Sequence, residues 1–148
     1  MVAVPSAQIP GFYHRRIGDI VVTALSDGYL DGTVDVMQNI TEGDAKSLLT
    51  GAFRPGRRTS VNCYLIYSAG RLALVETGSG DYLLPTAGKL QQNLKAAGVN
   101  PADIDTVILT HMHPDHIGLA HWLCERWSTP GQECRLWISS TDWNAARI

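Results

Sequence analysis

Residues 110–116 concentrate side chains that bind metal ions. His111, His113 and His116 supply imidazole nitrogens, and Asp115 supplies a carboxylate. Zinc and other first-row metals take these donors from proteins. Buried His and Asp side chains need partners to offset their lost hydration. Four of them within six positions therefore indicate a metal site rather than core packing.

The spacing divides this cluster into two parts. Residues two apart on an extended chain point to one side, so His111 and His113 can chelate one ion. Pro114 cannot donate a ladder hydrogen bond, and it ends the preceding strand. Asp115 and His116 then lie on the turned segment, where they can address a second ion. Two metals about 3.5–4 Å apart can hold a bridging hydroxide and polarise a carbonyl or phosphoryl oxygen.

Other polar residues offer weaker signals. Glu76 follows an apolar strand and precedes Thr77-Gly78-Ser79-Gly80. It either orients a ligand histidine through that ring's second nitrogen or belongs to a polar turn, and the spacing alone leaves both interpretations open. A surface position is the preferred interpretation for His14, and recruitment of His121 as a ligand is the less favoured one.

Size and charge restrict the class of protein. The chain has 148 residues, 45% of them hydrophobic and 18% charged, which fits one globular domain. Its net charge of −2 gives no electrostatic reason to expect nucleic acid or an anionic membrane as a partner. Arg54, Arg57 and Arg58 are the nearest approach to a basic patch, and we interpret them as part of a solvated loop.

The chain shows no targeting signal. Residues 1–10 lack the basic and apolar regions of a signal peptide, and no apolar run approaches the roughly 20 residues that span a bilayer. A disulfide between Cys124 and Cys134 is conceivable, but with an odd cysteine count that includes Cys63, free thiols in a reducing compartment are preferred. We therefore expect a cytoplasmic protein without a membrane partner.

The pattern of apolar residues predicts a mixed α/β fold. The turn signal Asp27-Gly28 is expected to end the first strand, and a second turn signal, Asp31-Gly32, follows a few residues later. Phe12, Tyr13, Trp122 and Trp127 are expected to fill the core rather than line a substrate pocket. The expected elements are a strand at 20–25, a helix at 41–49, a loop at 51–58, a hairpin of strands 61–67 and 72–75, a helix at 83–97, a helical turn at 101–105, a strand at 107–109, a helix at 121–127, a strand at 134–139 and a helix start at 140–142.

The order of residues in the cluster resembles a family signature. His111-Met112-His113-Pro114-Asp115-His116 resembles the H-x-H-x-D-H motif of the metallo-β-lactamase superfamily, and Leu74-Val75-Glu76-Thr77-Gly78 resembles its upstream acidic-Thr-Gly turn. Strings such as Thr23–Gly28 are similar to the methyl parathion hydrolase and quorum-quenching lactonase branch. The resemblance covers residues 10–119.

The resemblance implies an αββα sandwich of class α/β (α+β), of which this chain is the N-terminal half. It implies that His111 and His113 bind the first metal, and that Asp115 and His116 bind the second. Asp115 would also act catalytically, by orienting the bridging hydroxide and handling protons. Up to two zinc ions are the expected cofactor, although other divalent metals are compatible. Glu76 stands where the family usually has Asp, as a residue behind the metal ligands.

The later ligands of the family have no counterparts in this chain. The family adds a His, a bridging Asp and a last His, whereas no histidine follows His121 and the only later aspartate is Asp142. We therefore expect residues 1–148 to form a single incomplete domain, with residues 1–10 as a flexible segment. Half a sandwich would have an uncovered apolar patch on one face of its sheet. Such a patch favours association, so a homodimer is one of the expected partners.

The function indicated by the resemblance is metal-dependent hydrolysis of a small molecule. A metal-bound hydroxide would attack an ester-like bond in a lactone, phosphotriester or β-lactam. Two alternatives stay open. The chain is a catalytically incomplete fragment that only binds metal, or it is an iron-dependent oxidoreductase of the same superfamily.

Overall fold

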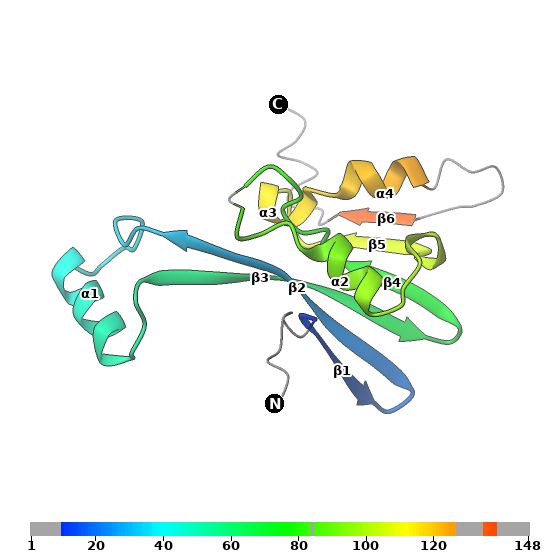
Figure 1. Ribbon diagram of the computed structural model, residues 1–148, viewed down its shortest axis with the longest axis horizontal. Helices are drawn as coiled ribbons and strands as arrows, with labels where there is room; N and C mark the ends of the chain where they lie inside the picture. Colours follow the sequence, from blue (N-terminus) through cyan, green and yellow to red (C-terminus); the bar gives the residue numbers. More distant parts are fainter. Residues whose placement is uncertain (1–9, 84, 127–134, 139–148) are drawn as a thin grey trace, which may run out of the picture.

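One mixed sheet of six strands, arranged in chain order, organises the computed structural model (Figure 1). The structure describes residues 10–83, 85–126 and 135–138. Strands β1 to β4 are antiparallel, and β5 and β6 continue the sheet in parallel. The elements are β1 (Phe12–Ile17), β2 (Ile20–Gly32), α1 (Glu42–Gly51), β3 (Arg57–Ser68), β4 (Arg71–Val75), α2 (Leu90–Ala96), the 3₁₀ turn η1 (Pro101–Asp103), β5 (Thr106–Leu109), α3 (Pro114–Ile117), α4 (Ala120–Arg126) and β6 (Arg135–Ile138).

This arrangement confirms the predicted α/β class and most of the predicted elements. The β3–β4 hairpin turns at Ala69 and Gly70, which both have positive φ. Helix α1 begins after Thr41, whose side chain accepts a hydrogen bond from the backbone N–H of Asp44. This contact satisfies one of the free donors at the helix start, so Thr41 is the cap.

Alternate residues of the central strands form the core under the helices. Leu25, Leu65, Leu74 and Val107 are buried on one face of the sheet. Helices α2 and α4 contribute the opposing residues Leu90, Leu94 and Leu123. Burying one such leucine stabilises a protein by about 1.5–3 kcal/mol. This packing fixes the sheet edge from which the histidine cluster extends.

The other face of the sheet carries a second apolar row. The strand register aligns Ala24, Tyr64, Val75, Ile108 and Trp137 across five strands. Tyr64 and Trp137 expose 40% and 62% of their surface. Ala24, Val75 and Ile108 are half-buried. A partly exposed apolar row of this kind is the surface expected of half a sandwich.

Strand β2 does not end where the sequence predicts. The turn expected at Asp27-Gly28 is wrong, because β2 continues through it with one irregularity in its pairing between Ser26 and Gly28. The second signal, Asp31-Gly32, coincides with the end of β2 at Gly32. Gly28 has a φ of 117°, and a Cβ there would lie 2.1 Å from the carbonyl oxygen of Thr86. The glycine therefore permits close approach of two backbone segments rather than a reversal of the chain.

The carboxylate of Asp27 explains the irregularity. The side chain is fully buried and accepts four hydrogen bonds. Ser79 donates from its backbone N–H at 2.8 Å and from its hydroxyl at 2.7 Å. The backbone N–H groups of Gly88 and Leu90 donate at 3.1 Å and 2.9 Å. Asp27 thereby ties β2 to the segment that leads into α2.

These bonds also shorten the predicted helix at 83–97, which is observed only from Leu90 to Ala96. The segment before α2 is hydrogen-bonded to β2 instead of forming helix. The Lys89 N–H donates to the Asp27 carbonyl at 2.9 Å, and the Thr86 hydroxyl donates to the Tyr29 carbonyl at 2.6 Å. Gly98, with a φ of 71°, follows the helix, as predicted for its C-terminal stop.

The N-terminal strand β1 is absent from the sequence-based expectation. Phe12 packs against the core as predicted, whereas Tyr13 is 71% exposed and its assignment to the core is wrong. His14 is exposed as predicted, and its Nδ1 lies 2.7 Å from the hydroxyl of Thr23. Trp122 packs against the core. The consecutive Arg15 and Arg16 place a charged side chain on each face of β1 and hide its strand pattern.

Some predictions lie outside the described residues. They concern residues 1–9 of the N-terminal segment, Trp127, Asp142, the helix start at 140–142 and the Cys124–Cys134 pair. Cys63 is a buried free cysteine, and burial raises the pKa of its thiol well above the ordinary value. No helix of the described chain has the length and apolar character to cross a membrane.

The junction of β4 and β5 is held by Asp105. Its Oδ1 accepts from Arg71 Nη2 at 2.7 Å, and its Oδ2 accepts from the backbone N–H of Leu72 at 3.2 Å. The hydrogen bond from Arg71, followed by that from Thr106, lowers the pKa of Asp105 to about 2. The carboxylate therefore stays ionised through ordinary pH and holds the two strands together.

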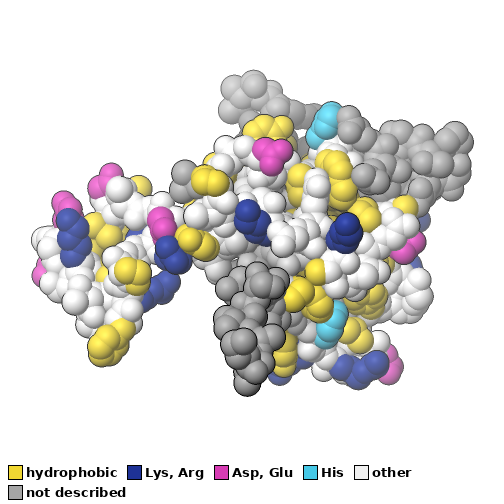
Figure 2. Space-filling model, in the orientation of Figure 1, with side chains coloured by type: hydrophobic (Ala, Val, Ile, Leu, Met, Phe, Trp, Pro, Cys, Tyr) yellow, Lys and Arg dark blue, Asp and Glu magenta, His cyan; other side chains and the backbone are white. Residues whose placement is uncertain are grey.

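Residues 29–60, which we call the arm, extend away from the rest of the sheet and carry α1 at their far end (Figure 1). Figure 2 shows acidic, basic and hydrophobic side chains mixed over this surface. The predicted loop at 51–58 is shorter than expected, because β3 begins at Arg57. Arg58 is exposed, as expected, and it is also paired: its guanidinium bonds both oxygens of Asp31 at 2.7 Å and lies 3.7 Å from the Tyr29 ring centroid.

Replacing Asp27 with Ala should destabilise the fold. Unpaired buried donors cost about 1–3 kcal/mol each, so we expect the free energy of unfolding to fall by about 2–4 kcal/mol after relaxation. Urea denaturation measures the change. Asp31→Ala is the control, because its carboxylate lies in an exposed ion pair and its loss should have little effect. Equal stability of Asp27→Ala and the unmodified chain would contradict the role of Asp27.

Candidate metal centre

The histidine cluster lies where β5 ends. The strand stops at Leu109, and α3 begins at Pro114, where proline fits the first turn of a helix. His113 precedes this helix with extended backbone angles of −75° and 152°. Pro114 thus follows the strand, as predicted, and it is the first residue of a short helix.

The structure brings the three predicted histidine ligands together. The ring centroid of His111 lies 4.6 Å from that of His113 and 3.8 Å from that of His116. His113 is exposed, whereas His111 and His116 are half-buried. The rings form one group at the carboxyl end of β5, a common position for sites in α/β proteins. His121, the less favoured candidate, is exposed on α4.

Asp115, the fourth predicted ligand, lies beside the rings. Its Oδ2 is 3.3 Å from Nε2 of His116. His111 Nδ1 lies 2.9 Å from the hydroxyl of Thr110. Across the described ranges, no three His, Cys, Asp or Glu side chains stand in an arrangement that could hold a metal ion. The predicted residues are therefore neighbours, but their donor atoms do not converge on one point.

Glu76 lies behind this group and is almost fully buried. Its Oε1 accepts a hydrogen bond from the backbone N–H of Thr110 at 2.8 Å. Its Oε2 is 3.0 Å from Nδ1 of His116, although the two atoms do not have the geometry of a hydrogen bond. Glu has one methylene more than the family's usual Asp. Its carboxylate nevertheless lies between the Thr110 N–H and the ring of His116.

Two buried atoms, Glu76 Oε2 and His116 Nδ1, thus lack a hydrogen bond. Burial of unpaired polar atoms is costly, and functional sites are one place where it is found. The imidazole of His116 has a carboxylate on each side, and this negative surrounding favours a cation. The donor types therefore fit a divalent metal ion, with Glu76 placed to orient His116 through the nitrogen opposite Nε2.

The backbone of the cluster is fixed by the turn after β4. The carbonyl of His116 accepts two hydrogen bonds from Thr77, from the backbone N–H at 2.7 Å and from the hydroxyl at 2.9 Å. The N–H of Gly118 donates to the carbonyl of Gly78 at 2.7 Å. A Cβ at Gly118 would lie 2.2 Å from the carbonyl oxygen of Ser79. The two loops therefore approach too closely for any residue but glycine.

The sequence indicates only part of this support. Gly118, shortly after the cluster, is typical of close backbone approach at a turn, and the structure confirms that approach. Thr77 is recognisable only as part of a polar turn. Asp27, which binds Ser79 in the same turn, was interpreted as a turn signal. A charged residue at the centre of an apolar strand was the available signal, because a buried carboxylate requires partners elsewhere in the chain.

Gly118→Ala should separate the two loops. Overpacking against backbone costs about 1–3 kcal/mol, and we expect the free energy of unfolding to fall by a comparable amount. Urea denaturation gives the stability, and NMR signals of the histidine rings report the cluster. Gly51→Ala is the matched control, because no atom lies within 4 Å of its added Cβ. Unchanged stability and ring signals in Gly118→Ala would refute this account of the contact.

Comparison with known proteins places the chain in a family. The family model described as the metallo-beta-lactamase superfamily matches residues 56–144. The crystal structure of AbOPH, a hydrolase in the beta lactamase superfamily, is similar with a TM-score of 0.70 and 32% identity, over 75% of this chain and 39% of that one. The dizinc quorum-quenching lactonase AidC is similar with a TM-score of 0.67 and 29% identity, over 73% and 38%.

Among curated proteins, ribonuclease Z of Mycobacterium avium (strain 104) is 38% identical over 60 residues, which are 40% of this chain and 21% of that protein. The chain thus spans about a fifth of this relative and about two-fifths of the two solved structures. The predicted fold and family resemblance are confirmed. The chain belongs to the metallo-β-lactamase superfamily.

Proposed function

We propose that this chain carries the first part of the metal centre of a metal-dependent hydrolase. The observation that carries the proposal is the grouping of the His111, His113 and His116 rings at the end of β5, beside Asp115 and backed by Glu76. Membership of a superfamily with hydrolase relatives supports it.

Zinc is the metal that the donor set suits best. We assign His111 and His113 to a first ion and Asp115 and His116 to a second, and the dizinc relative AidC supports two ions in a complete site. A bound zinc ion supplies Lewis acidity and makes water acidic enough to act near neutral pH. Glu76 would hold the ring of His116 in orientation from its buried side.

Asp115 is our candidate for proton transfer. Its carboxylate is half-buried and lies beside the rings, with Oδ2 3.3 Å from Nε2 of His116, so it is placed to accept a proton from a water molecule bound at the cluster. A positioned general base of this kind contributes about 10²–10⁴-fold to a rate. Met112, which is 39% exposed between two of the histidines, offers apolar contact to a substrate.

The substrate class that we propose is a small ester-like molecule, with a lactone first and a phosphotriester second. The similarity to a lactonase and to hydrolase AbOPH supports this choice. A second candidate function is metal binding without turnover. It is favoured by the number of assigned ligands, because His111 and His113 are only two for the first ion, whereas catalytic zinc typically has three protein ligands.

His113→Ala should abolish zinc binding, since His113 is the second imidazole of the first ligand pair. We expect the purified chain to hold fewer than two equivalents of zinc, measured by metal analysis after gel filtration. His14→Ala is the control, because His14 lies on β1 against Thr23 and should leave the zinc content unchanged. Retention of zinc by His113→Ala would remove this residue from the ligand set.

Hydrolysis is tested with an N-acyl homoserine lactone and an aryl phosphotriester in the presence of zinc. We expect turnover of the lactone that falls at least about 10²-fold in Asp115→Asn, which removes the proposed base, while His14→Ala keeps the rate. Zinc binding without hydrolysis of either substrate would favour the second candidate function. Equal rates in Asp115→Asn and the unmodified chain would exclude Asp115 as the base.

A further inference from the structure

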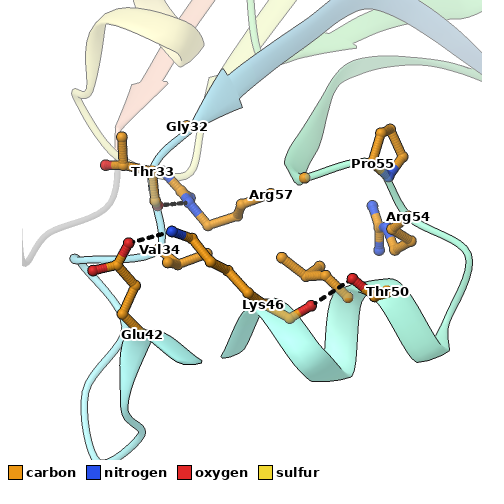
Figure 3. Close-up of a pocket in the computed structure, with 11 residues that line it drawn as sticks. Gly32, Thr33, Val34, Glu42, Lys46, Thr50, Arg54, Pro55 and Arg57 are labelled. Carbon is orange, nitrogen blue, oxygen red and sulfur yellow. Dashed lines mark hydrogen bonds and ion pairs between the residues drawn. The ribbon is translucent and has the colours of Figure 1, made fainter. Parts of the chain in front are cut away.

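The arm contains a cavity of about 450 Å³ that none of the predicted metal ligands lines. It lies between α1, the segment that follows β2, and the segment that leads into β3 (Figure 3). Its walls include Gly32, Val34, Glu42, Lys46, Leu49, Thr50, Arg54, Pro55 and Arg57. The proposed hydrolase function does not use this cavity, so its charge pattern needs another explanation.

Positive charge dominates the wall. Lys46, Arg54 and Arg57 face a single lining carboxylate, that of Glu42. Glu42 lies 2.5 Å from the Lys46 ammonium, in an exposed pair one helical turn apart. Figure 3 shows the three cationic side chains around the cavity. Two guanidinium groups are thus left with no carboxylate of the wall to neutralise them.

The two guanidinium groups are anchored through neutral partners. Arg57 Nε donates to the Thr33 carbonyl at 2.6 Å, and Arg54 Nη2 donates to the Arg58 carbonyl at 2.8 Å. These bonds orient the side chains but leave their charge in place. Asp35 is the remaining nearby carboxylate, and its side chain accepts a hydrogen bond from Thr33 rather than from Arg57. This hydrogen bond is the largest cause that lowers the pKa of Asp35, and the attraction to Arg57 is the smallest. Each guanidinium keeps further N–H donors for an anion.

Gly32 places Arg57 at the cavity. A Cβ on Gly32 would lie 2.0 Å from Nη2 and 2.6 Å from Cζ of Arg57. The guanidinium therefore rests directly on the glycine backbone, and its Nε is held by the next residue. A cation fixed in this way loses little conformational freedom when it binds a ligand.

Arg58 shows how this chain treats an arginine without a ligand role. Its guanidinium donates from Nε and Nη2 to the two oxygens of the Asp31 carboxylate, and it also lies over the Tyr29 ring. Arg54 and Arg57, close by in sequence, lack such a carboxylate fork among the described residues. The difference distinguishes a structural arginine from two that are available to an external anion.

We propose that this cavity binds a small organic phosphate. Arg54, Arg57 and Lys46 would surround the phosphate group, whose tetrahedral oxygens accept hydrogen bonds from several directions. Val34, Leu49 and Pro55 would contact its organic part, and the cavity leaves room for one. A nucleic-acid strand suits the site less well, because its binding requires cations that follow the backbone over many nucleotides.

The test is a titration of the ¹⁵N-labelled chain with phenyl phosphate, followed by NMR. We expect saturable shifts of the Arg57 Nε–H signal and of the backbone amides of Thr33 and Thr50. Arg57→Gln should weaken binding by about tenfold or more, since it removes charge-assisted hydrogen bonds. Gly32→Ala should also weaken binding, because it displaces Arg57 while keeping every charge.

Arg58→Gln is the matched control and should bind phenyl phosphate as the unmodified chain does. Phenol, which lacks the phosphate, should not shift the same signals. The proposal is overturned if phenol and phenyl phosphate act alike, if Arg58→Gln weakens binding as much as Arg57→Gln, or if the shifts occur only in residues 110–118. Arg54→Gln provides a second variant if Arg57→Gln does not give a folded spectrum.

Discussion

The buried carboxylate of Asp27 is the constraint on which the rest of the structure depends. A carboxylate inside a protein is tolerated only when several donors replace its water, and here four do so. Three of them are backbone N–H groups from a segment more than 50 residues away. Because these donors come from both ends of that segment, one side chain fixes the turn after β4 and the start of α2 at once.

The turn that Asp27 fixes also positions the histidine cluster, through backbone hydrogen bonds. Ser79, held by Asp27, directly follows Thr77 and Gly78, whose N–H and carbonyl groups bond to the loop after β5. The carbonyl of His116 and the N–H of Gly118 are both bonded to this turn. The position of the histidine rings is therefore set by residues outside the proposed ligand set. This is how a site gains precision from rigid surroundings rather than from its ligands alone.

The sequence predicted the parts that depend on local pattern. The cluster, the β3–β4 hairpin, α1 and β5 follow from spacing and apolar runs, and the structure has them. The errors share a physical cause, which is that long-range bonds overrode local preference. Asp27-Gly28 has the composition of a turn, but a buried carboxylate and a close backbone contact keep β2 extended. The helix expected from residue 83 loses its first turns because their N–H groups are bonded elsewhere. β1 is not recognised from the sequence because Arg15 and Arg16 interrupt the apolar alternation on both of its faces.

Glu76 shows how much the surrounding structure imposes on one residue. Its φ of 62° lies in the left-handed region, which costs a residue other than glycine about 1–3 kcal/mol. The cost is offset by its position: one carboxylate oxygen fixes the Thr110 N–H, and the other faces His116 Nδ1. A strained and buried carboxylate is a poor choice for a simple polar turn, which any exposed residue could form. Its conformation agrees with the proposed role of Glu76, because it places the carboxylate directly behind the ring of His116.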